Sequence, residues 1–223
     1  MSCRTVPQRA VSFSLTGNVA ILWLLLAIEP LYRNTWLLEN VLRVPASVIL
    51  FATWRVLPLS LTSCIAPYLF FSLHAIGAHF TYSLVPYDEA LRDLSSQPLN
   101  GLLGFTRNHY NRLVHFAYGL LIFQPIREMI MLHAKVCGFW SYVLPLDFIM
   151  STSAIYELLE WASAIAFGGD VGAAFLGTQG DEWDAQRDMG LAGLGSPIAI
   201  AITFAFDRRY GNEPASKRSL DAT

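Results

Sequence analysis

Residues 59–82 of the chain read LSLTSCIAPYLFFSLHAIGAHFTY. The stretch carries no Asp, Glu, Lys or Arg, and its length suits a bilayer core, which a helix crosses in about 20 residues. Backbone N–H and C=O groups inside lipid must be hydrogen-bonded within the segment, so such a segment folds as an α-helix. The stretch therefore predicts a transmembrane helix.

Five further stretches have the same apolar character, at residues 11–28, 36–57, 110–132, 139–167 and 189–206. The longest, 139–167, exceeds what a bilayer needs and must tilt or protrude. The last begins with Gly190, Gly193 and Gly195, small residues that let helices approach closely. We predict an all-α fold, a polytopic transmembrane bundle of about six spans. Residues 1–210 would form a single domain, followed by a polar cytoplasmic tail at 211–223.

The composition agrees with a membrane protein. The chain has 223 residues, of which 54% are hydrophobic and only 14% charged, whereas soluble domains carry about 25% charged residues. A net charge of -2 gives no reason to expect a nucleic-acid partner. Three cysteines without a CxxC spacing argue against a disulfide framework or a thiolate metal site. The expected partner is the lipid bilayer, and the oligomeric state stays open.

The charges that flank the apolar stretches predict an orientation. Arg4 and Arg9 precede the first stretch, which ends in Glu29-Pro30 without a small-residue cleavage site, so we interpret it as a retained span. Eight Lys and Arg residues fall on the side of both termini and six on the other. This bias favours a multi-pass inner-membrane protein with both termini in the cytoplasm. The long connections at 83–109 and 168–188 would then face outside.

Histidines mark the same end of two predicted spans. His74 and His79 lie near the end of residues 59–82, and His115 lies near the start of residues 110–132. Neutral imidazole is a common metal ligand. His74 and His79 are five residues apart, which is not one helical face, but Gly77 could loosen the turn so that both converge. The alternatives are interfacial histidines paired with carboxylates, or His79 as a helix cap.

Charged residues in these stretches are candidates for binding or catalysis. Arg112 shares a helix face with His115 and suits a phosphate or carboxylate, unless it only snorkels to the interface. Glu157 and Glu160, three residues apart, also share a face. They could ligate a metal, share a proton as an acid–base pair, or form salt bridges to Arg112 or Arg107.

An acidic stripe precedes the last span. Asp181, Asp184 and Asp188 fall on one helical face. Such a stripe suits a hard cation such as magnesium, or hydrogen bonds that orient ligating histidines. The alternative is a solvated interfacial helix. Glu39 and Arg43, four residues apart in 36–57, have the order that favours a helical ion pair.

Four ordered motifs carry a family resemblance over residues 18–209. They are His74-x-x-Gly77-x-His79-x-Thr81-Tyr82, Asn111-Arg112-Leu-Val-His115-Phe116, Tyr156-Glu157-Leu-Leu-Glu160-Trp161 and Gly177-Thr-Gln-Gly180-Asp181-x-Trp183-Asp184-Ala-Gln186-x-Asp188-Met189. Together they resemble the YjdF-like bacterial inner membrane proteins. Asn111 departs from the family pattern, which has an acidic residue there. The resemblance implies a multi-span bacterial membrane protein and supplies no reaction.

Three hypotheses follow from the polar residues gathered at one membrane side. The first is a metal-dependent hydrolase or transferase acting on a lipid or lipid-linked substrate. A divalent cation (zinc, iron, manganese or magnesium) would be held by residues drawn from His74, His79, His115, Glu157, Asp181, Asp184 and Asp188. Glu157, Glu160 and Arg112 would serve catalysis. The second hypothesis is a small proton-coupled transporter, and the third is a structural or assembly protein that uses the cluster as a polar lock.

Overall fold

The computed structural model describes residues 6–56, 59–95, 97–169, 172 and 176–210, and within them the regular secondary structure is helical, without strands. This confirms the predicted all-α class. The six long helices in the described part are α1 (Val6–Leu26), α2 (Arg33–Val56), α3 (Leu61–His79), α6 (Tyr110–His133), α7 (Trp140–Phe167) and α9 (Asp184–Tyr210). Two short helices, α4 (Tyr87–Ser95) and α5 (Leu99–Leu103), lie between α3 and α6. The predicted tail at 211–223 lies outside the described residues.

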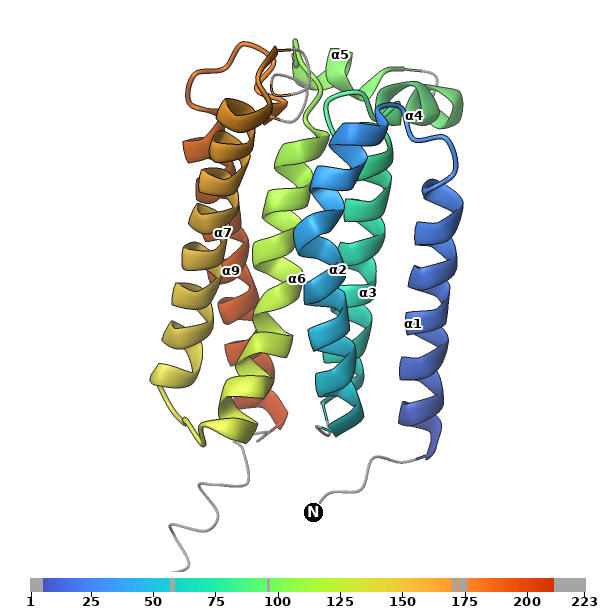
Figure 1. Cartoon of the computed structure of the whole chain (residues 1–223). Coiled ribbons are helices and arrows are strands. Elements are labelled where there is room, and N and C mark those ends of the chain that lie inside the picture. The colour runs from blue at the N-terminus through green and yellow to red at the C-terminus, as the bar shows by residue number, and fades with distance from the viewer. Residues whose placement is uncertain (1–5, 57–58, 96, 170–171, 173–175, 211–223) are drawn as a thin grey trace, which may run out of the picture.

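The long helices stand side by side as one bundle (Figure 1). α6 lies in the middle, in contact with α3, α7 and α9, while α1 packs on α3 at one edge. The short helices α4 and α5 cover one end of the bundle, which we call the loop end. The described start of α1 and the described end of α9 both lie at the opposite end of the bundle, which we call the terminal end (Figure 1).

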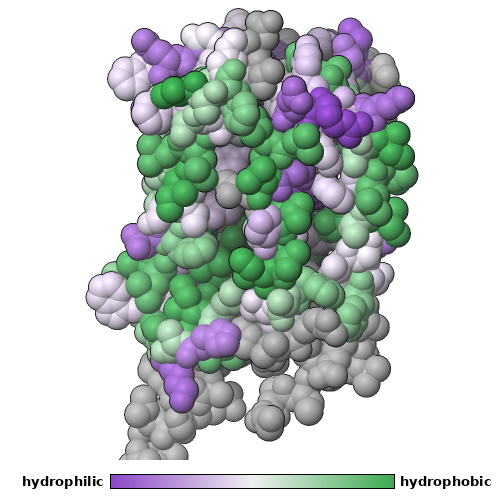
Figure 2. Space-filling model, viewed as in Figure 1, coloured by the Kyte–Doolittle hydropathy of each residue, from purple (hydrophilic) through white to green (hydrophobic). Residues whose placement is uncertain are grey.

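The outer surface of the bundle is apolar along much of its length. Large hydrophobic side chains such as Leu25, Val48 and Leu158 are exposed, and Figure 2 shows apolar residues over the middle of the face and hydrophilic ones gathered toward the loop end. Among the described helices, the segments Arg33–Thr53, Leu61–His79 and Asp184–Arg209 are long and apolar enough to cross a membrane. The protein is therefore a helical membrane protein, and the count of six spans stays a prediction.

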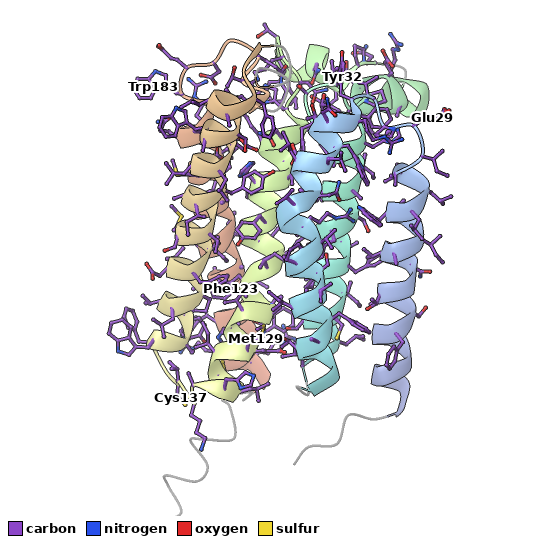
Figure 3. The ribbon with its side chains drawn as sticks, viewed as in Figure 1. Glu29, Tyr32, Phe123, Met129, Cys137 and Trp183 are labelled. Atoms are coloured by element: carbon purple, nitrogen blue, oxygen red, sulfur yellow. The ribbon has the colours of Figure 1, made fainter. Side chains whose placement is uncertain are left out.

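Small residues bring α6 and α9 into close contact. A Cβ atom at Gly119 would overlap the carbonyl group of Ala192, and one at Gly195 would overlap the carbonyl oxygen of Phe116. The buried side chain of Phe123 packs in the same interior, next to Ile149 of α7 (Figure 3). Of the three glycines that the sequence places at the start of the last span, Gly195 lies against α6 and Gly193 against Met150 of α7, whereas Gly190 meets no neighbouring atom within 4 Å. The contacts of Gly119 and Gly195 fix the register of α9 on α6.

A polar contact joins the same three helices at the terminal end. Arg127 of α6 forms an ion pair of 2.7 Å with Asp207 of α9, and the hydroxyl of Tyr142 on α7 donates a 2.7 Å hydrogen bond to the same carboxylate. With α6, α7 and α9 tied together here, their positions at the loop end are constrained as well.

Candidate metal centre

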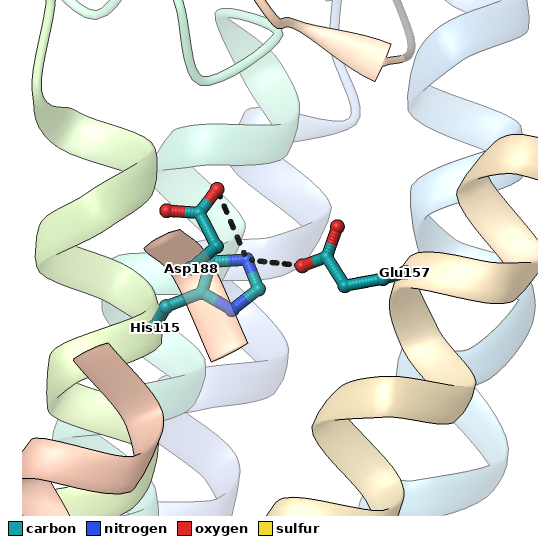
Figure 4. Close-up of side chains that lie close together, drawn as sticks. All are labelled: His115, Glu157 and Asp188. Atoms are coloured by element: carbon teal, nitrogen blue, oxygen red, sulfur yellow. Dashed lines mark ion pairs between the residues drawn. The ribbon is translucent and has the colours of Figure 1, made fainter. Parts of the chain in front are cut away.

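Three buried side chains from three helices converge near the loop end (Figure 4). His115 of α6 places Nε2 3.5 Å from Oε1 of Glu157 on α7 and 3.9 Å from Oδ2 of Asp188 on α9. One ligand atom from each of the three residues lies within 4.8 Å of the other two. Among the described residues this is the group whose geometry could hold a metal ion, and we call it the His115 cluster.

The packing of α6 on α9 explains why His115 and Asp188 meet. Both helices run from the loop end to the terminal end (Figure 1). Gly119 lies against Ala192, and His115 and Asp188 each stand one helical turn before these contact residues. Because residues four apart share a face, the close glycine contact places the imidazole beside the carboxylate.

The donor set and spacing of the His115 cluster fit a divalent cation. Metal bonds to imidazole nitrogen and carboxylate oxygen are about 2.0–2.2 Å long, so two ligands of one ion lie at most about 4.4 Å apart. The two separations from His115, 3.5 and 3.9 Å, satisfy this limit, and all three ligand atoms lie within 4.8 Å of one another. A mixed set of imidazole and carboxylate without thiolate suits zinc, iron or manganese.

Two oxygen atoms of the cluster lack hydrogen-bond partners. Within the described residues, Oε1 of Glu157 and Oδ1 of Asp188 are buried and accept no hydrogen bond. The other oxygen of Asp188 accepts a 2.7 Å hydrogen bond from the side-chain amide of Asn111. Buried carboxylate oxygens are costly unless they are paired or bind a cation. The unpartnered Oε1 of Glu157 is the oxygen that lies 3.5 Å from His115, whereas at Asp188 the oxygen nearest the imidazole is Oδ2, the acceptor from Asn111, and Oδ1 is the unpartnered one. Both carboxylates therefore have an oxygen that a cation could use.

The other two aspartates of the acidic stripe pair with arginines. Asp181 contacts Arg107 at 3.3 Å, Arg112 at 2.5 Å and also Arg187. Asp184 contacts Arg107 at 2.9 Å and Arg112 at 3.5 Å. Asp181 and Asp184 thus form an ion-pair network at the loop end, separate from the three ligand atoms of the His115 cluster.

This network keeps Asp181 ionised. Its partial burial would raise the pKa of the carboxyl group, but the backbone N–H of Trp183 and the guanidinium groups of Arg187, Arg112 and Arg107 outweigh that effect and lower the pKa below its ordinary value of 3.8. At neutral pH the carboxylate is therefore a permanent partner for the arginines.

The remaining predicted site residues do not belong to the His115 cluster. Nδ1 of His74 is hydrogen-bonded to the Tyr82 hydroxyl, and Nδ1 of His79 bonds the carbonyl oxygen of Leu26 at 2.8 Å. Glu160 is buried on α7, one turn beyond Glu157. The structure therefore brings together His115, Glu157 and Asp188, and it places His74, His79, Asp181 and Asp184 in other contacts.

Two charged residues of α2 make contacts other than the one that the sequence suggested. The predicted ion pair between Glu39 and Arg43 is not formed in the described structure. Glu39 instead accepts a 2.7 Å hydrogen bond from the Tyr156 hydroxyl of α7. Arg43 donates to the side-chain oxygen of Asn40 and to the carbonyl oxygen of Phe71. Both residues are buried. A charged residue within an apolar stretch indicates an interior position, so the sequence could have identified both as interior groups.

A cavity of about 460 Å³ adjoins the His115 cluster. Its walls come from α2, α3, α6 and α7, and His115 and Asn111 form part of its lining. In Figure 2 the surface is hollowed between α7 and α2. The volume lies within the range of about 300–1,000 Å³ that is usual for small-molecule sites. The sequence alone gave no indication of this cavity.

The architecture defines the class of the protein, an all-α membrane protein with buried polar groups near one end. Within that class, the family described as "Predicted membrane protein (DUF2238)" matches residues 11–209, and the chain belongs to this family. Inner membrane protein YjdF of Escherichia coli (strain K12) is 32% identical over 184 residues, which cover 80% of this chain and 84% of that protein. These findings confirm the resemblance drawn from the four motifs. No solved structure matches the chain.

Proposed function

We propose that the protein is a membrane-embedded metal-dependent enzyme, a hydrolase or transferase that acts on a lipid-type substrate. The observation that carries the proposal is the convergence of three buried ligand atoms from three helices within 4.8 Å. The adjoining apolar cavity supports a lipid-type substrate, because it brings an apolar molecule next to His115. The proposed ligands are His115, Glu157 and Asp188.

The residues around the cluster have distinct proposed roles. A bound divalent cation would supply Lewis acidity to a carbonyl or phosphoryl oxygen or activate a water molecule. Glu160, buried one turn from Glu157, is the proposed general base. Arg112 is held by Asp181 and Asp184, so a contact between Arg112 and a substrate anion requires an exchange of partners. Asn111 orients Asp188 through its hydrogen bond.

The proposal also includes an orientation. Both described ends of the chain lie at the terminal end of the bundle (Figure 1), and the bias of Lys and Arg favours a cytoplasmic position for that end. The loop end and the His115 cluster then face the outer side of the inner membrane, where a substrate would come from the outer leaflet.

Metal analysis of the purified full-length protein tests the proposal. We expect about one divalent cation per chain, which His115→Ala and Glu157→Gln each remove and which His79→Ala retains. His79 is the matched control, because it is a histidine of the same bundle end whose imidazole binds a backbone carbonyl group. Purified protein that contains no metal, and whose thermal midpoint is unchanged by zinc, manganese or chelator, would contradict the proposal.

The structural alternative gives a different result in the same samples. If the cluster only locks helices together, a double-mutant cycle of His115 and Glu157 shows a coupling energy in the free energy of unfolding, while no metal is bound. Under the enzyme proposal, most of that coupling depends on the metal and disappears after chelation.

A further inference from the structure

Arg43 is a buried cation without a carboxylate partner. Only 5% of its surface is exposed, and no Asp or Glu oxygen among the described residues lies within the 4.0 Å of an ion pair. Its two terminal nitrogens donate to neutral oxygen atoms, those of Asn40 and Phe71, at 3.2 and 3.3 Å, and its guanidinium carbon lies 6.0 Å from the centre of the Trp23 ring, a contact that carries no negative charge. Arginine stays protonated in proteins, and an uncompensated charge inside a membrane bundle is expensive and marks a functional site.

Arg43 also belongs to the wall of the cavity. Its Nε is buried without a hydrogen-bond partner within the described chain. Ser153 of α7 is another lining residue, and its hydroxyl is likewise buried and without a partner within the described chain. Two unpartnered polar groups in the lining, one from α2 and one from α7, point to a polar ligand, and the positive charge of Arg43 indicates that this ligand is an anion.

Beyond this polar region the cavity is apolar. Toward the terminal end, its lining includes Ile49 and Leu50 of α2 and Ile122, Ile126 and Met129 of α6. The lining residues of α6 extend from Asn111 to Met129, which corresponds to about 27 Å of helix at a rise of 1.5 Å per residue. A cavity of this shape matches an extended hydrocarbon chain better than a compact solute.

We propose that the cavity binds a single-chain amphiphile with an anionic headgroup, taken from the bilayer. The headgroup, a carboxylate or a phosphate, binds Arg43 and Ser153, and the chain lies between α2, α3, α6 and α7 toward the terminal end. This names the substrate class of the enzyme and rests on the proposed function for its chemistry. The binding itself needs no metal, so it can be tested separately.

Both parts of the cavity are needed to select this ligand. A small soluble anion would satisfy Arg43 but leave the apolar lining empty. A neutral lipid would fill the lining but leave the buried guanidinium without a counter-charge, which costs free energy in a medium of low dielectric constant. An anionic amphiphile satisfies both parts.

The test is equilibrium binding of radiolabelled palmitate to the full-length protein in detergent, after treatment with chelator. Competition with hexadecyl phosphate, hexadecanol and inorganic phosphate shows how much the headgroup and the hydrocarbon chain each contribute to binding. We expect saturable binding of one palmitate per chain, competition by hexadecyl phosphate, and competition by hexadecanol that is at least tenfold weaker. Whichever of palmitate and hexadecyl phosphate binds more tightly indicates whether the headgroup is a carboxylate or a phosphate. Equal competition by hexadecanol, effective competition by inorganic phosphate, or a lack of saturable binding would overturn the proposal.

Variants assign the binding to the cavity. We expect Arg43→Gln to weaken palmitate binding at least tenfold and to leave hexadecanol binding unchanged. Arg33→Gln is the matched control, because Arg33 begins the same helix and donates to the backbone carbonyl of Ala27 instead. If Arg43→Gln does not fold, Ile126→Trp, which fills the apolar part, must reduce the binding of both ligands. Arg43→Gln protein that folds and binds palmitate like the natural chain contradicts the proposal.

The metal proposal and the amphiphile proposal fail in different ways. His115→Ala that lacks metal but still binds palmitate is the result expected when both are correct. Natural protein that binds palmitate but never a metal contradicts only the proposed function. Natural protein that binds a metal but not palmitate contradicts only the amphiphile proposal.

Discussion

The carboxylate of Asp188, one of the three proposed metal ligands, is held in place by a neighbouring residue. One carboxylate oxygen is held at 2.7 Å by the amide of Asn111, and the other is buried without a partner. The hydrogen bond holds Oδ2, and this same oxygen lies 3.9 Å from Nε2 of His115, while Oδ1 is the unpartnered one. Groups that hydrogen-bond metal ligands commonly raise metal affinity by 10- to 100-fold.

We therefore expect Asn111→Ala to weaken metal binding by about 10- to 100-fold, measured by competition with a chelating dye. The reason is that the carboxylate of Asp188 loses its fixed orientation, although all three ligands remain. Gln124→Ala is the control, since it removes an amide from the same helix whose hydrogen bonds go to Glu128 and Thr203. An Asn111→Ala protein that binds metal like the natural chain would show that this hydrogen bond has no part in the site.

The arginine contacts of Asp181 give a second prediction, about pH. Because these contacts lower the pKa of its carboxyl group below 3.8, the ionised form stabilises the folded state. This stabilisation is fully present above the ordinary value of 3.8 and is lost as the pH falls through the lowered pKa of the folded state. The difference in thermal midpoint between the natural protein and Asp181→Asn should therefore be constant from pH 7 to 5 and shrink below pH 3.8.

Glu182→Gln is the control for this pH series, because it removes one negative charge at the neighbouring exposed position. It should leave the thermal midpoint nearly unchanged throughout the range. A difference for Asp181→Asn that is absent at pH 7, or that grows as the pH falls, contradicts the account of the network.

The residue scale also shows where sequence-based reasoning ends. The positions of His74, His79 and His115 within the apolar stretches predict which side of the membrane they lie on. They do not predict which way each side chain points around its helix. At about 100° per residue, five residues separate His74 and His79 by about 140° around the helix. His74 accordingly lines the cavity, while His79 bonds Leu26 at the end of α1. The idea that Gly77 would let both converge is not needed to explain either contact.

At the scale of elements, the contact between α6 and α9 positions the His115 cluster. We expect Gly195→Ala to destabilise the protein by about 1–3 kcal/mol, the usual effect of overpacking, because the added methyl group meets the carbonyl oxygen of Phe116. It should also weaken metal binding, since α9 carries Asp188. Thermal unfolding and metal titration of the purified variant measure the two effects.

Gly190→Ala provides the matched control on the same helix. A Cβ atom there meets no other atom within 4 Å, so the substitution should be neutral or stabilising by up to about 1 kcal/mol through helix propensity. Equal behaviour of the two variants would mean that the close contact of α6 with α9 does not hold the cluster together.

The helices themselves could be predicted closely, and their differences have a physical cause. The stretch 139–167 corresponds to α7, Trp140–Phe167, and 110–132 to α6, Tyr110–His133. The last helix begins at Asp184, earlier than the apolar stretch at 189–206. Hydropathy indicates only the part of a helix that suits lipid. The helix itself starts earlier, because the acidic turn with Asp184 continues the same backbone hydrogen bonds beyond the apolar stretch.

At the scale of the whole molecule, the common position of the two described ends predicts the topology. We expect cysteines placed at Trp183 and Phe139 to react from opposite sides of the membrane, in a chain whose native cysteines are replaced by alanine. Both positions are exposed, and Trp183 lies at the loop end, whereas Phe139 lies two residues from Cys137 at the terminal end (Figure 3). With a membrane-impermeant maleimide, Trp183→Cys should react in intact spheroplasts and Phe139→Cys only after permeabilisation. The reverse pattern would invert the proposed orientation.

The cavity belongs to the whole molecule as well, and this is why the sequence could not indicate it. Its walls combine single residues from four helices, for example Leu50, Phe70, Ile122 and Leu159. Each of these residues fits an ordinary apolar span. Whether they enclose space depends on how far α2 stands from α7, which is set by tertiary contacts such as that between Glu39 and Tyr156.

X-ray absorption at the metal edge of the zinc-loaded, purified protein tests the central claim most directly. The account predicts one imidazole nitrogen and carboxylate oxygens at about 2.0–2.2 Å from the metal. The imidazole signal should disappear in His115→Ala and persist in His79→Ala. A spectrum with sulfur ligands, a spectrum without imidazole in the natural protein, or an imidazole signal that survives in His115→Ala would contradict the assignment of His115, Glu157 and Asp188 as a metal centre.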